Sequence, residues 1–365
     1  MYIKEVQENL IKMMNERTEI KVIGSLEIIE KPIPEAEDKG GIDRREKEDF
    51  LRFLEFKKLG SEKKDKIKPS ISNLRMMFGS SKNFDISTNV LTEEIKINGR
   101  DGEIPVKIYK TESDKIRPAF VFIHGGGWFA GSTKVVENAC KYLAEKADSV
   151  VISVDYRLCP ENRFPAGLHD CYDTVLWVYE NHSDLKIDKN KIGIGGDSAG
   201  GNLATCTTLL DRELGSNIIK FQALLYPTVI NGDIEVSDYK FDINMYDYDK
   251  DEDIAKQLIM MIKDLPDIGD LYVNDVKELE NKLISPLLAD DLKNMSDTLI
   301  IVAEYDYLTL EAEAYARKLV NDGVNTKLIK YKGISHAIID KIGRYPQAQD
   351  CMDEIAVSFI KAVNK

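Results

Sequence analysis

A serine stands among small residues in the segment GDSAG, residues 196–200. The apolar run Lys191–Gly195 before it predicts a strand, and the pattern Leu203–Leu214 after it predicts a helix. A serine on such a strand-turn-helix, with glycines two residues to either side, is typical of a nucleophile elbow that presents its hydroxyl to a carbonyl. The sequence therefore predicts Ser198 as the nucleophile of an acyl-transfer reaction. The alternative is a glycine-rich turn with a structural role only.

A serine hydroxyl is a poor nucleophile at neutral pH and needs a base, which is usually histidine. Where a nucleophile elbow of this kind is used, the chain order is serine, then acid, then histidine. Only one of the four histidines, His336, lies after Ser198, and it follows the predicted strand Lys327–Tyr331. His336 is therefore the expected base. The remaining histidines are His124, His169 and His182.

The acid of such a site should follow the strand that lies between the serine and the histidine. The apolar run Thr298–Ala303 predicts that strand, and acidic residues come directly after it. Asp306 is the preferred acid, with Glu304 and Glu311 as the alternatives. Its carboxylate would orient the imidazole of the base and stabilise the imidazolium that forms during attack.

Acyl transfer also needs hydrogen-bond donors for the oxygen that becomes negative. The segment HGGGW, residues 124–128, follows the predicted strand Ala119–Ile123. Backbone without side chains can approach a tetrahedral intermediate closely, so the N–H groups of Gly125, Gly126 and Gly127, together with that of Ala199, are the expected oxyanion hole. A phosphate loop is the alternative, but no GxxxxGK[ST] or GxGxxG frame surrounds these glycines. His124 is expected to orient the loop and not to act as a base.

These side chains require a regular framework, and from residue 93 onward apolar runs alternate with helical patterns. Continuous apolar strands between helices predict an α/β fold with a mostly parallel, eight-stranded sheet covered on both faces. The acidic segment 231–282 interrupts the alternation, and insertions of this length are often lids. The predicted division is a helical N-terminal region, residues 1–85, and a catalytic domain, residues 86–365, which carries the insertion 231–282. The predicted strands are 93–98, 106–109, 119–123, 150–154, 191–195, 221–226, 298–303 and 327–331.

Composition narrows the function further. The 365 residues are 43% hydrophobic and 31% charged, which fits a folded globular protein and excludes a disordered chain. A formal net charge of −13 opposes binding to nucleic acid and to anionic membranes, and no run of about 18 apolar residues occurs. The five cysteines are widely spaced without CxxC pairs, and the histidines have no HExxH spacing, so we expect no disulfide framework, no metal and no cofactor. A cytoplasmic location is expected.

With these motifs in place, the chain resembles the hormone-sensitive lipase family of α/β-hydrolase carboxylesterases, also called bacterial family IV. Further segments similar to that family are SVDYRLCPENRFPA at 153–166, LLYP at 224–227, SPLLA at 285–289 and AEYDYL at 303–308. The resemblance covers about residues 90–365. It implies a triad of Ser198, Asp306 and His336, and a cap built from the N-terminal region and the insertion. The chain departs from the family pattern at Cys159, at residues 307–310 and at Ala337-Ile338, where the family has Gly-Phe.

The function expected from this reading is hydrolysis of short to medium acyl esters through an acyl-enzyme. Trp128, Met260 and Met261 are the expected substrate-binding residues, because indole and thioether side chains suit an adaptable apolar lining. The expected partner is a small-molecule ester, and a homodimer is left open. One alternative is an amidase of the arylformamidase type, which also uses an HGG loop. A non-catalytic ligand receptor on the same fold is the other, and the presence of His336 argues against it.

Overall fold

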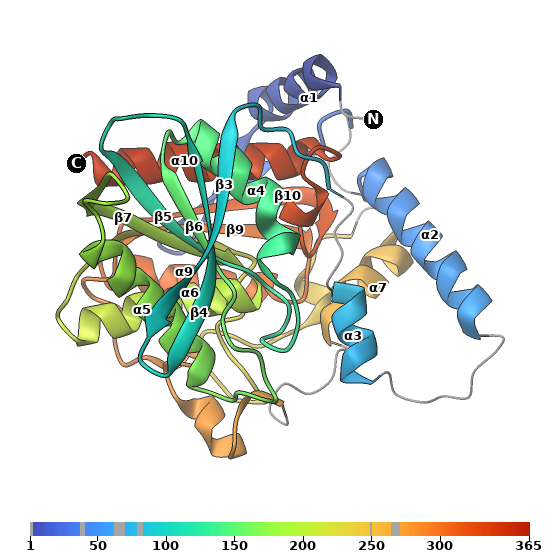
Figure 1. Ribbon diagram of the computed structural model, residues 1–365. Coiled ribbons are helices and arrows are strands. Elements are labelled where there is room, and N and C mark those ends of the chain that lie inside the picture. Colours follow the sequence, from blue (N-terminus) through green and yellow to red (C-terminus); the bar gives the residue numbers. More distant parts are fainter. Residues whose placement is uncertain (1–2, 37–40, 62–69, 79–82, 249, 264–270) are drawn as a thin grey trace.

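A computed structural model describes residues 3–36, 41–61, 70–78, 83–248, 250–263 and 271–365 (Figure 1). The eight predicted strands are present as β3 to β10, and two further strands precede them. The strands are β1 Glu19–Ile23, β2 Leu26–Lys31, β3 Val90–Gly99, β4 Gly102–Thr111, β5 Arg117–Ile123, β6 Val150–Val154, β7 Ile187–Asp197, β8 Ile219–Leu225, β9 Asp297–Tyr305 and β10 Thr326–Ser335. The helices are α1 Lys4–Glu16, α2 Arg44–Ser61, α3 Ile71–Phe78, α4 Thr133–Lys146, α5 Ala166–Glu180, α6 Ala199–Glu213, α7 Glu252–Lys263, α9 Thr309–Asn321 and α10 Pro346–Val363, with short 3₁₀ turns η1 Ile243–Met245, η2 Val276–Glu280, η3 Pro286–Leu288 and η4 Ile339–Lys341.

All ten strands form one sheet, in the order β1-β2-β10-β9-β8-β7-β5-β6-β4-β3. Six of its nine pairings are parallel, so the mostly parallel sheet of an α/β fold is confirmed. The expectation of eight strands was wrong by two, and the N-terminal region is not only helical. Its hairpin of β1 and β2 turns at Gly24, whose φ of +63° suits glycine, and β2 pairs in parallel with β10.

The hairpin was not predicted because its strands are short and rich in Glu and Lys. Every residue of β1 is exposed, and β2 buries only part of its side chains. Such strands lack the apolar run or clean alternation by which a strand is recognised in a sequence. Strand β2 is held by hydrogen bonding to β10, a strand about 300 residues further along the chain, and β1 is held by its pairing with β2.

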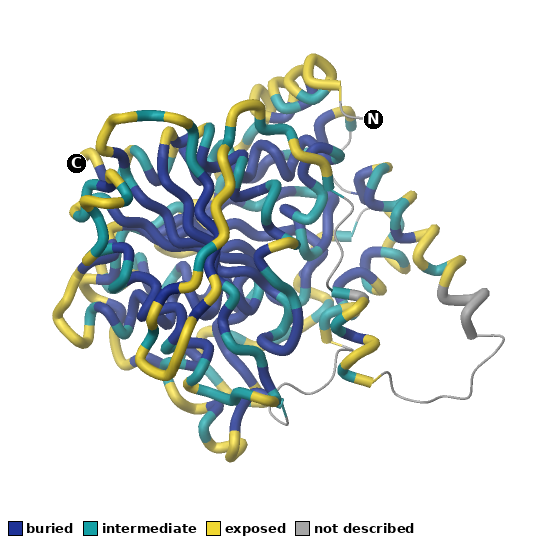
Figure 2. The backbone as a smooth tube through the Cα atoms, viewed as in Figure 1, coloured by how far each residue is buried: buried dark blue, intermediate teal, exposed yellow. Residues whose placement is uncertain are grey.

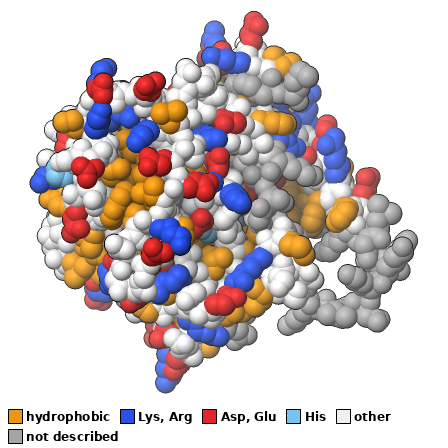
Figure 3. Space-filling view, in the orientation of Figure 1, with side chains coloured by type: hydrophobic (Ala, Val, Ile, Leu, Met, Phe, Trp, Pro, Cys, Tyr) orange, Lys and Arg blue, Asp and Glu red, His pale blue; other side chains and the backbone are white. Residues whose placement is uncertain are grey.

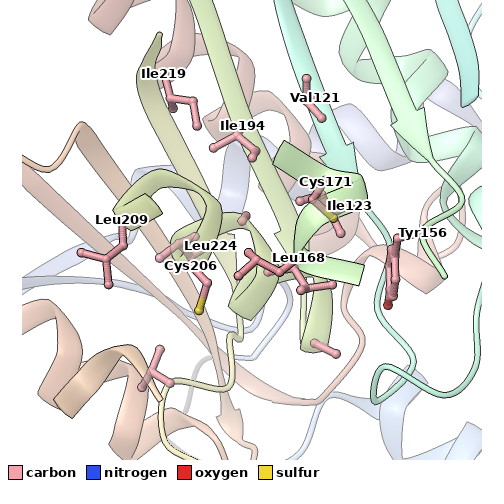
Figure 4. Close-up of a cluster of buried hydrophobic side chains, with 14 of the residues drawn as sticks. Val121, Ile123, Tyr156, Leu168, Cys171, Ile194, Cys206, Leu209, Ile219 and Leu224 are labelled. Atoms are coloured by element: carbon pink, nitrogen blue, oxygen red, sulfur yellow. The ribbon is translucent and has the colours of Figure 1, made fainter. Parts of the chain in front are cut away.

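Helices cover both faces of the sheet, because successive side chains of each strand point to opposite sides. In β5, Val121 and Ile123 belong to one buried cluster, whereas Phe120 and Phe122 belong to the other. Helices α5, α6 and α9 close the first face, and α4 and α10 close the second, with Met14 of α1 also buried there. Figure 4 shows part of the first face, where Leu168 and Cys171 of α5 and Cys206 and Leu209 of α6 meet the strands.

Burial is greatest in the middle of the sheet and falls toward its ends. Figure 2 shows the central strands buried along their length, whereas α1 is largely exposed. In Figure 3, acidic and basic side chains are interspersed over the visible face. Within the described ranges, no helix is long and apolar enough to cross a membrane.

Three helices lie beside the sheet rather than on its faces, namely α2, α3 and α7 (Figure 1). Phe50 of α2 and Leu258 and Ile259 of α7 share a small buried cluster with Tyr305, the last residue of β9. The N-terminal region and the insertion therefore pack together at the end of a central strand. Parts of both expected cap segments, residues 37–40, 62–69, 79–82, 249 and 264–270, lie outside the described residues.

Candidate active site

Four loops of interest leave the sheet at the same edge. Strands β5, β7, β9 and β10 run parallel, so their carboxyl ends face the same side of the molecule. The first residues after these strands are His124, Ser198, Asp306 and His336. In open α/β sheets, ligands bind outside this carboxyl edge. The fold thus brings the predicted nucleophile, acid, base and oxyanion loop to one edge.

Ser198 occupies a strained turn between β7 and α6. Its φ of 55° and ψ of −118° lie in a region that L-residues rarely adopt. The turn is held by a hydrogen bond of 2.9 Å from the Ser198 N–H to the Leu225 carbonyl at the end of β8. The residue is half-buried at the edge of the sheet.

The glycines of this turn are required by close backbone contacts. A Cβ on Gly196 would lie 2.4 Å from the carbonyl oxygen of Ile123, and one on Gly200 would lie 2.1 Å from the same oxygen. Real Cβ atoms do not approach backbone oxygen so closely. The two glycines therefore let the serine turn pack directly against the end of β5, where the oxyanion loop begins.

The predicted acid and base are in contact. The Nδ1 atom of His336 lies 2.7 Å from Oδ2 of Asp306. This contact follows from the register of β9 and β10, in which Tyr305 is paired with Ser335, so the next residue of each strand is Asp306 and His336. Asp306 is fully buried, and its other oxygen accepts the N–H of Leu308 at 3.0 Å.

The alternative acids are engaged elsewhere. Glu304 is buried against Lys332 and accepts the N–H of Gly333 at 2.7 Å. Glu311 is buried and accepts the N–H of Val229 at 2.8 Å, and burial raises the pKa of its carboxyl to about 8. Of the three acids that the sequence offered, Asp306 is the one that contacts His336.

The glycine loop has the conformation that its sequence demands, but one of its donors is already used. Gly126 and Gly127 have φ of +118° and +59°, where glycine is favoured. The N–H of Gly125 donates to Oδ1 of Asp197 at 2.9 Å. This differs from the prediction that Gly125 would serve the oxyanion. The remaining predicted donors are Gly126, Gly127 and Ala199, the first residue of α6, whose N–H has no intrahelical acceptor by position.

His124 is part of the loop's support. Its Nδ1 lies 2.8 Å from the carbonyl oxygen of Gly125, and its ring stacks on Tyr156 with centroids 4.4 Å apart. The side chain is buried, and burial lowers the pKa of His124. These contacts agree with the expectation that this histidine orients the loop.

Several residues near the site were not found from the sequence. Tyr226, after β8, packs edge-to-face on His336 with ring centroids 4.7 Å apart. Arg75 of α3 donates to the carbonyl oxygens of Phe129 at 2.7 Å and Cys159 at 2.9 Å. Only the tertiary fold brings these residues to the site, so no sequence spacing pointed to them.

Two carboxyl groups lie close to the serine turn and the base. Burial, with the nearby charge of Asp340, raises the pKa of Asp197 to about 7. Burial likewise raises the pKa of Asp340 to about 6, opposed by the charge of Lys341 and of His336. The position of Asp197 next to the serine was visible in the sequence, whereas its proximity to Asp340 was not.

The expected substrate-binding residues differ in their burial. Trp128 is 1% exposed and stacks on Tyr272 with ring centroids 4.8 Å apart. Met260 is half-buried and Met261 is 40% exposed, while α7 packs through Leu258 and Ile259. Their contact with substrate stays a prediction. Over the described ranges, no group of three or more His, Cys, Asp or Glu residues is placed to hold a metal ion.

Known proteins share this sequence pattern and this fold. A family model described as an alpha/beta hydrolase fold matches residues 120–340. The chain is 35% identical to an arylesterase of Saccharolobus solfataricus over 248 residues, which are 68% of this chain and 77% of that protein. It is 32% identical to the carboxylesterase NlhH of Mycobacterium tuberculosis over 249 residues, 66% of this chain and 74% of the relative.

A solved esterase from Pyrobaculum calidifontis has a similar structure, with a TM-score of 0.68 and 30% sequence identity. The match covers 80% of this chain and 94% of that one. The extent of these matches confirms the resemblance found in the motifs. The chain belongs to the hormone-sensitive-lipase-type family of α/β-hydrolase esterases.

Proposed function

We propose that this protein is a serine carboxylesterase in which Ser198, His336 and Asp306 form a catalytic triad. The observation that carries the proposal is the 2.7 Å contact between His336 and Asp306, on the same edge of the sheet as the strained turn of Ser198. A carboxylate on Nδ1 favours the tautomer that carries its proton there. The Nε2 atom is then left as the acceptor for the serine proton.

In the proposed reaction, the Ser198 oxygen attacks the ester carbonyl while His336 takes its proton. His336 then gives that proton to the departing alcohol, and the acyl group remains bound to the serine as an acyl-enzyme. Water, deprotonated by His336, attacks this acyl group, and the acid leaves as Ser198 regains its proton. Asp306 keeps its charge throughout and stabilises the imidazolium.

The N–H groups of Gly126, Gly127 and Ala199 are the proposed donors to the tetrahedral oxyanion. The hydrogen bond from Gly125 to Asp197 anchors the loop beside the serine turn, so the donors are fixed before substrate binds. A preorganised donor of this kind contributes about 3 kcal/mol to stabilising the transition state.

The cap and substrate class are a second part of the proposal. Residues 1–85 and 231–282 would together cover the acyl pocket of the catalytic domain, residues 86–365, because α2 and α7 share a buried cluster at the end of β9. Met260 and Met261 would border the pocket, and esters with short to medium acyl chains would be preferred over long-chain triglycerides. A change in acyl-length profile on replacing both methionines with larger side chains tests this assignment.

The triad is tested by comparing the parent, Ser198→Ala and, as a matched control, the exposed loop variant Ser183→Ala on p-nitrophenyl esters of increasing acyl length. Ser198→Ala should lower kcat by roughly 10³-fold or more with the fold intact, because it deletes only the nucleophile. An organophosphate should label the parent and the control at Ser198. Residual activity within tenfold of the parent would refute the assignment, and preferred turnover of N-formyl arylamines would favour the amidase alternative.

A homodimer and a cytoplasmic location stay predictions. Sedimentation velocity over a range of concentrations would decide the first, and cell fractionation would decide the second.

A further inference from the structure

The first turn of α2 lies against the loop that carries His336. Glu46 of α2 accepts a hydrogen bond from the Ser335 hydroxyl and another of 2.6 Å from the Lys341 ammonium. Just before the helix, the Asp43 N–H donates to the Gly333 carbonyl at 2.7 Å. These contacts join residues that are almost 300 positions apart in the chain.

The position of Glu46 relative to the base is specific. Ser335 directly precedes His336, and Lys341 follows five residues later with its Nζ atom 3.5 Å from the His336 carbonyl oxygen. The carboxylate therefore binds the loop on both sides of the histidine. Its residue is only 4% exposed, and a buried carboxylate is costly unless it is paired, so these bonds are strongly favoured over solvent-separated arrangements.

Two further carboxylates, one just before α2 and one within it, also bond to the segment that follows His336. Asp49 accepts 2.6 Å and 2.9 Å hydrogen bonds from Arg344 and the Tyr345 hydroxyl. Asp43 accepts one of 2.8 Å from the Gln347 amide. Residues 333–347, from the end of β10 to the start of α10, are thus bonded at several points to Asp43 and to the first turns of α2, and Glu46 is the contact nearest to the histidine.

The loop needs such support because of its backbone. Ala337, the residue after the histidine, has φ of 61°, a left-handed conformation that is unfavourable for alanine. Strained residues persist only where the surrounding structure holds them. The bond from Asp306 fixes one ring nitrogen of His336 but does not hold the loop backbone on either side of it.

We propose that Glu46 is a positioning residue for His336. It holds the backbone on both sides of the base, so that Nε2 is directed at the Ser198 hydroxyl. The N-terminal region would then be part of the reaction's machinery as well as part of a cap. This inference rests on the proposed function, because it assigns no role to Glu46 unless His336 is the base.

The test compares Glu46→Gln with Glu48→Gln, a matched control two residues along the same helix whose side chain is 64% exposed. Glutamine keeps the size of Glu46 and weakens its bonds to Ser335 and Lys341. Misplacement of a catalytic group by about 1 Å can cost up to about 100-fold, so we expect Glu46→Gln to lower kcat by roughly tenfold or more. KM should stay within about twofold of the parent, and Glu48→Gln should match the parent in both constants. If Glu46→Gln merely lost folded protein, fewer active sites would be labelled by an organophosphate, but kcat per labelled site would stay unchanged.

Two more variants keep the inference testable if Glu46→Gln folds poorly. Ser335→Ala and Lys341→Met each remove one of the bonds to Glu46, and each should lower kcat per organophosphate-labelled site. The double variant Glu46→Gln/Ser335→Ala should cost less than the sum of the two single variants, because both changes act on the same bond. Unchanged kcat per labelled site in these variants would overturn the inference while Ser198→Ala still abolished activity; activity in Ser198→Ala would instead refute the proposed function.

Discussion

The turn of Ser198 and the loop of His336 lie at the same edge of the sheet but are held in different ways. The serine turn is shaped by its own neighbours, because Gly196 and Gly200 let it close against the end of β5. The ring of His336 is held by Asp306, and the loop around it is bonded to Glu46 and Asp49 of α2 and to Asp43 just before that helix. A local steric device thus fixes Ser198, whereas side chains from distant segments hold His336 and its loop.

The difference has a consequence for how substitutions act. Changes in the serine turn should disturb the packing of β5, β7 and α6 and therefore the stability of the sheet. Changes in the polar contacts between α2 and the histidine loop should alter catalysis more than stability, since the apolar residues of that loop, Ile338, Ile339 and Ile342, stay buried in the core. Two experiments separate these effects, and a third tests how stability depends on pH.

The largest effect on kcat is expected from a change in the contact between Asp306 and His336. Asp306→Asn should lower kcat by about 10⁴-fold, because an amide cannot hold the imidazole in the required tautomer or stabilise its charged form. Glu311→Gln should retain kcat within tenfold, since Glu311 bonds Val229 and not His336. Both are measured on a p-nitrophenyl ester at one pH. A crippled Glu311→Gln beside a nearly normal Asp306→Asn would show that the acid was chosen wrongly.

A second substitution tests the close packing of the serine turn against the end of β5. Gly200→Ala places a Cβ 2.1 Å from the Ile123 carbonyl oxygen, so the turn must shift, and we expect a loss of about 3 kcal/mol or more in the free energy of unfolding. Gly201→Ala, whose nearest contact is 3.0 Å from the Pro227 Cβ, is the control and should lose clearly less. Urea titration of the three proteins gives the comparison. Equal stability of Gly200→Ala and the parent would mean that the turn is not held by this contact.

The smallest effect concerns how stability depends on pH. Burial raises the pKa of Glu311 to about 8 from an ordinary value of 4.5, so between these values the folded protein keeps a proton that the unfolded chain releases. The contribution of this carboxyl group to the free energy of unfolding is fully present below pH 4.5 and is lost as the pH rises through about 8. Glutamine does not titrate and can still accept a hydrogen bond from the Val229 N–H. The Tm of Glu311→Gln should therefore fall less than that of the parent between pH 5 and pH 9. The exposed control Glu55→Gln should follow the parent, and a Glu311→Gln curve parallel to it would contradict the prediction.

The same contrast explains what the sequence could reveal. The serine turn and the glycine loop are local patterns of five residues, and most strands from β3 to β10 contain an apolar run or an alternation of apolar and polar residues, so each could be recognised without a structure. The pairing of Asp306 with His336 was reached through chain order. The bond from Gly125 to Asp197 and the support from Glu46 and Arg75 depend on which segments meet in three dimensions, which no spacing in the sequence encodes.

The hairpin of β1 and β2 also decides where the sheet stops. Without it, β10 would be an edge strand with a row of unpaired backbone groups, and such edges recruit strands of other molecules. The actual edge is β1, which has five residues and carries Lys21, paired with Glu30, between the exposed Ile20 and Val22. A short, charged edge discourages further pairing. A chain shortened beyond Lys31 would therefore expose β10 to aggregation, and that limit should guide any truncated version made for crystallisation.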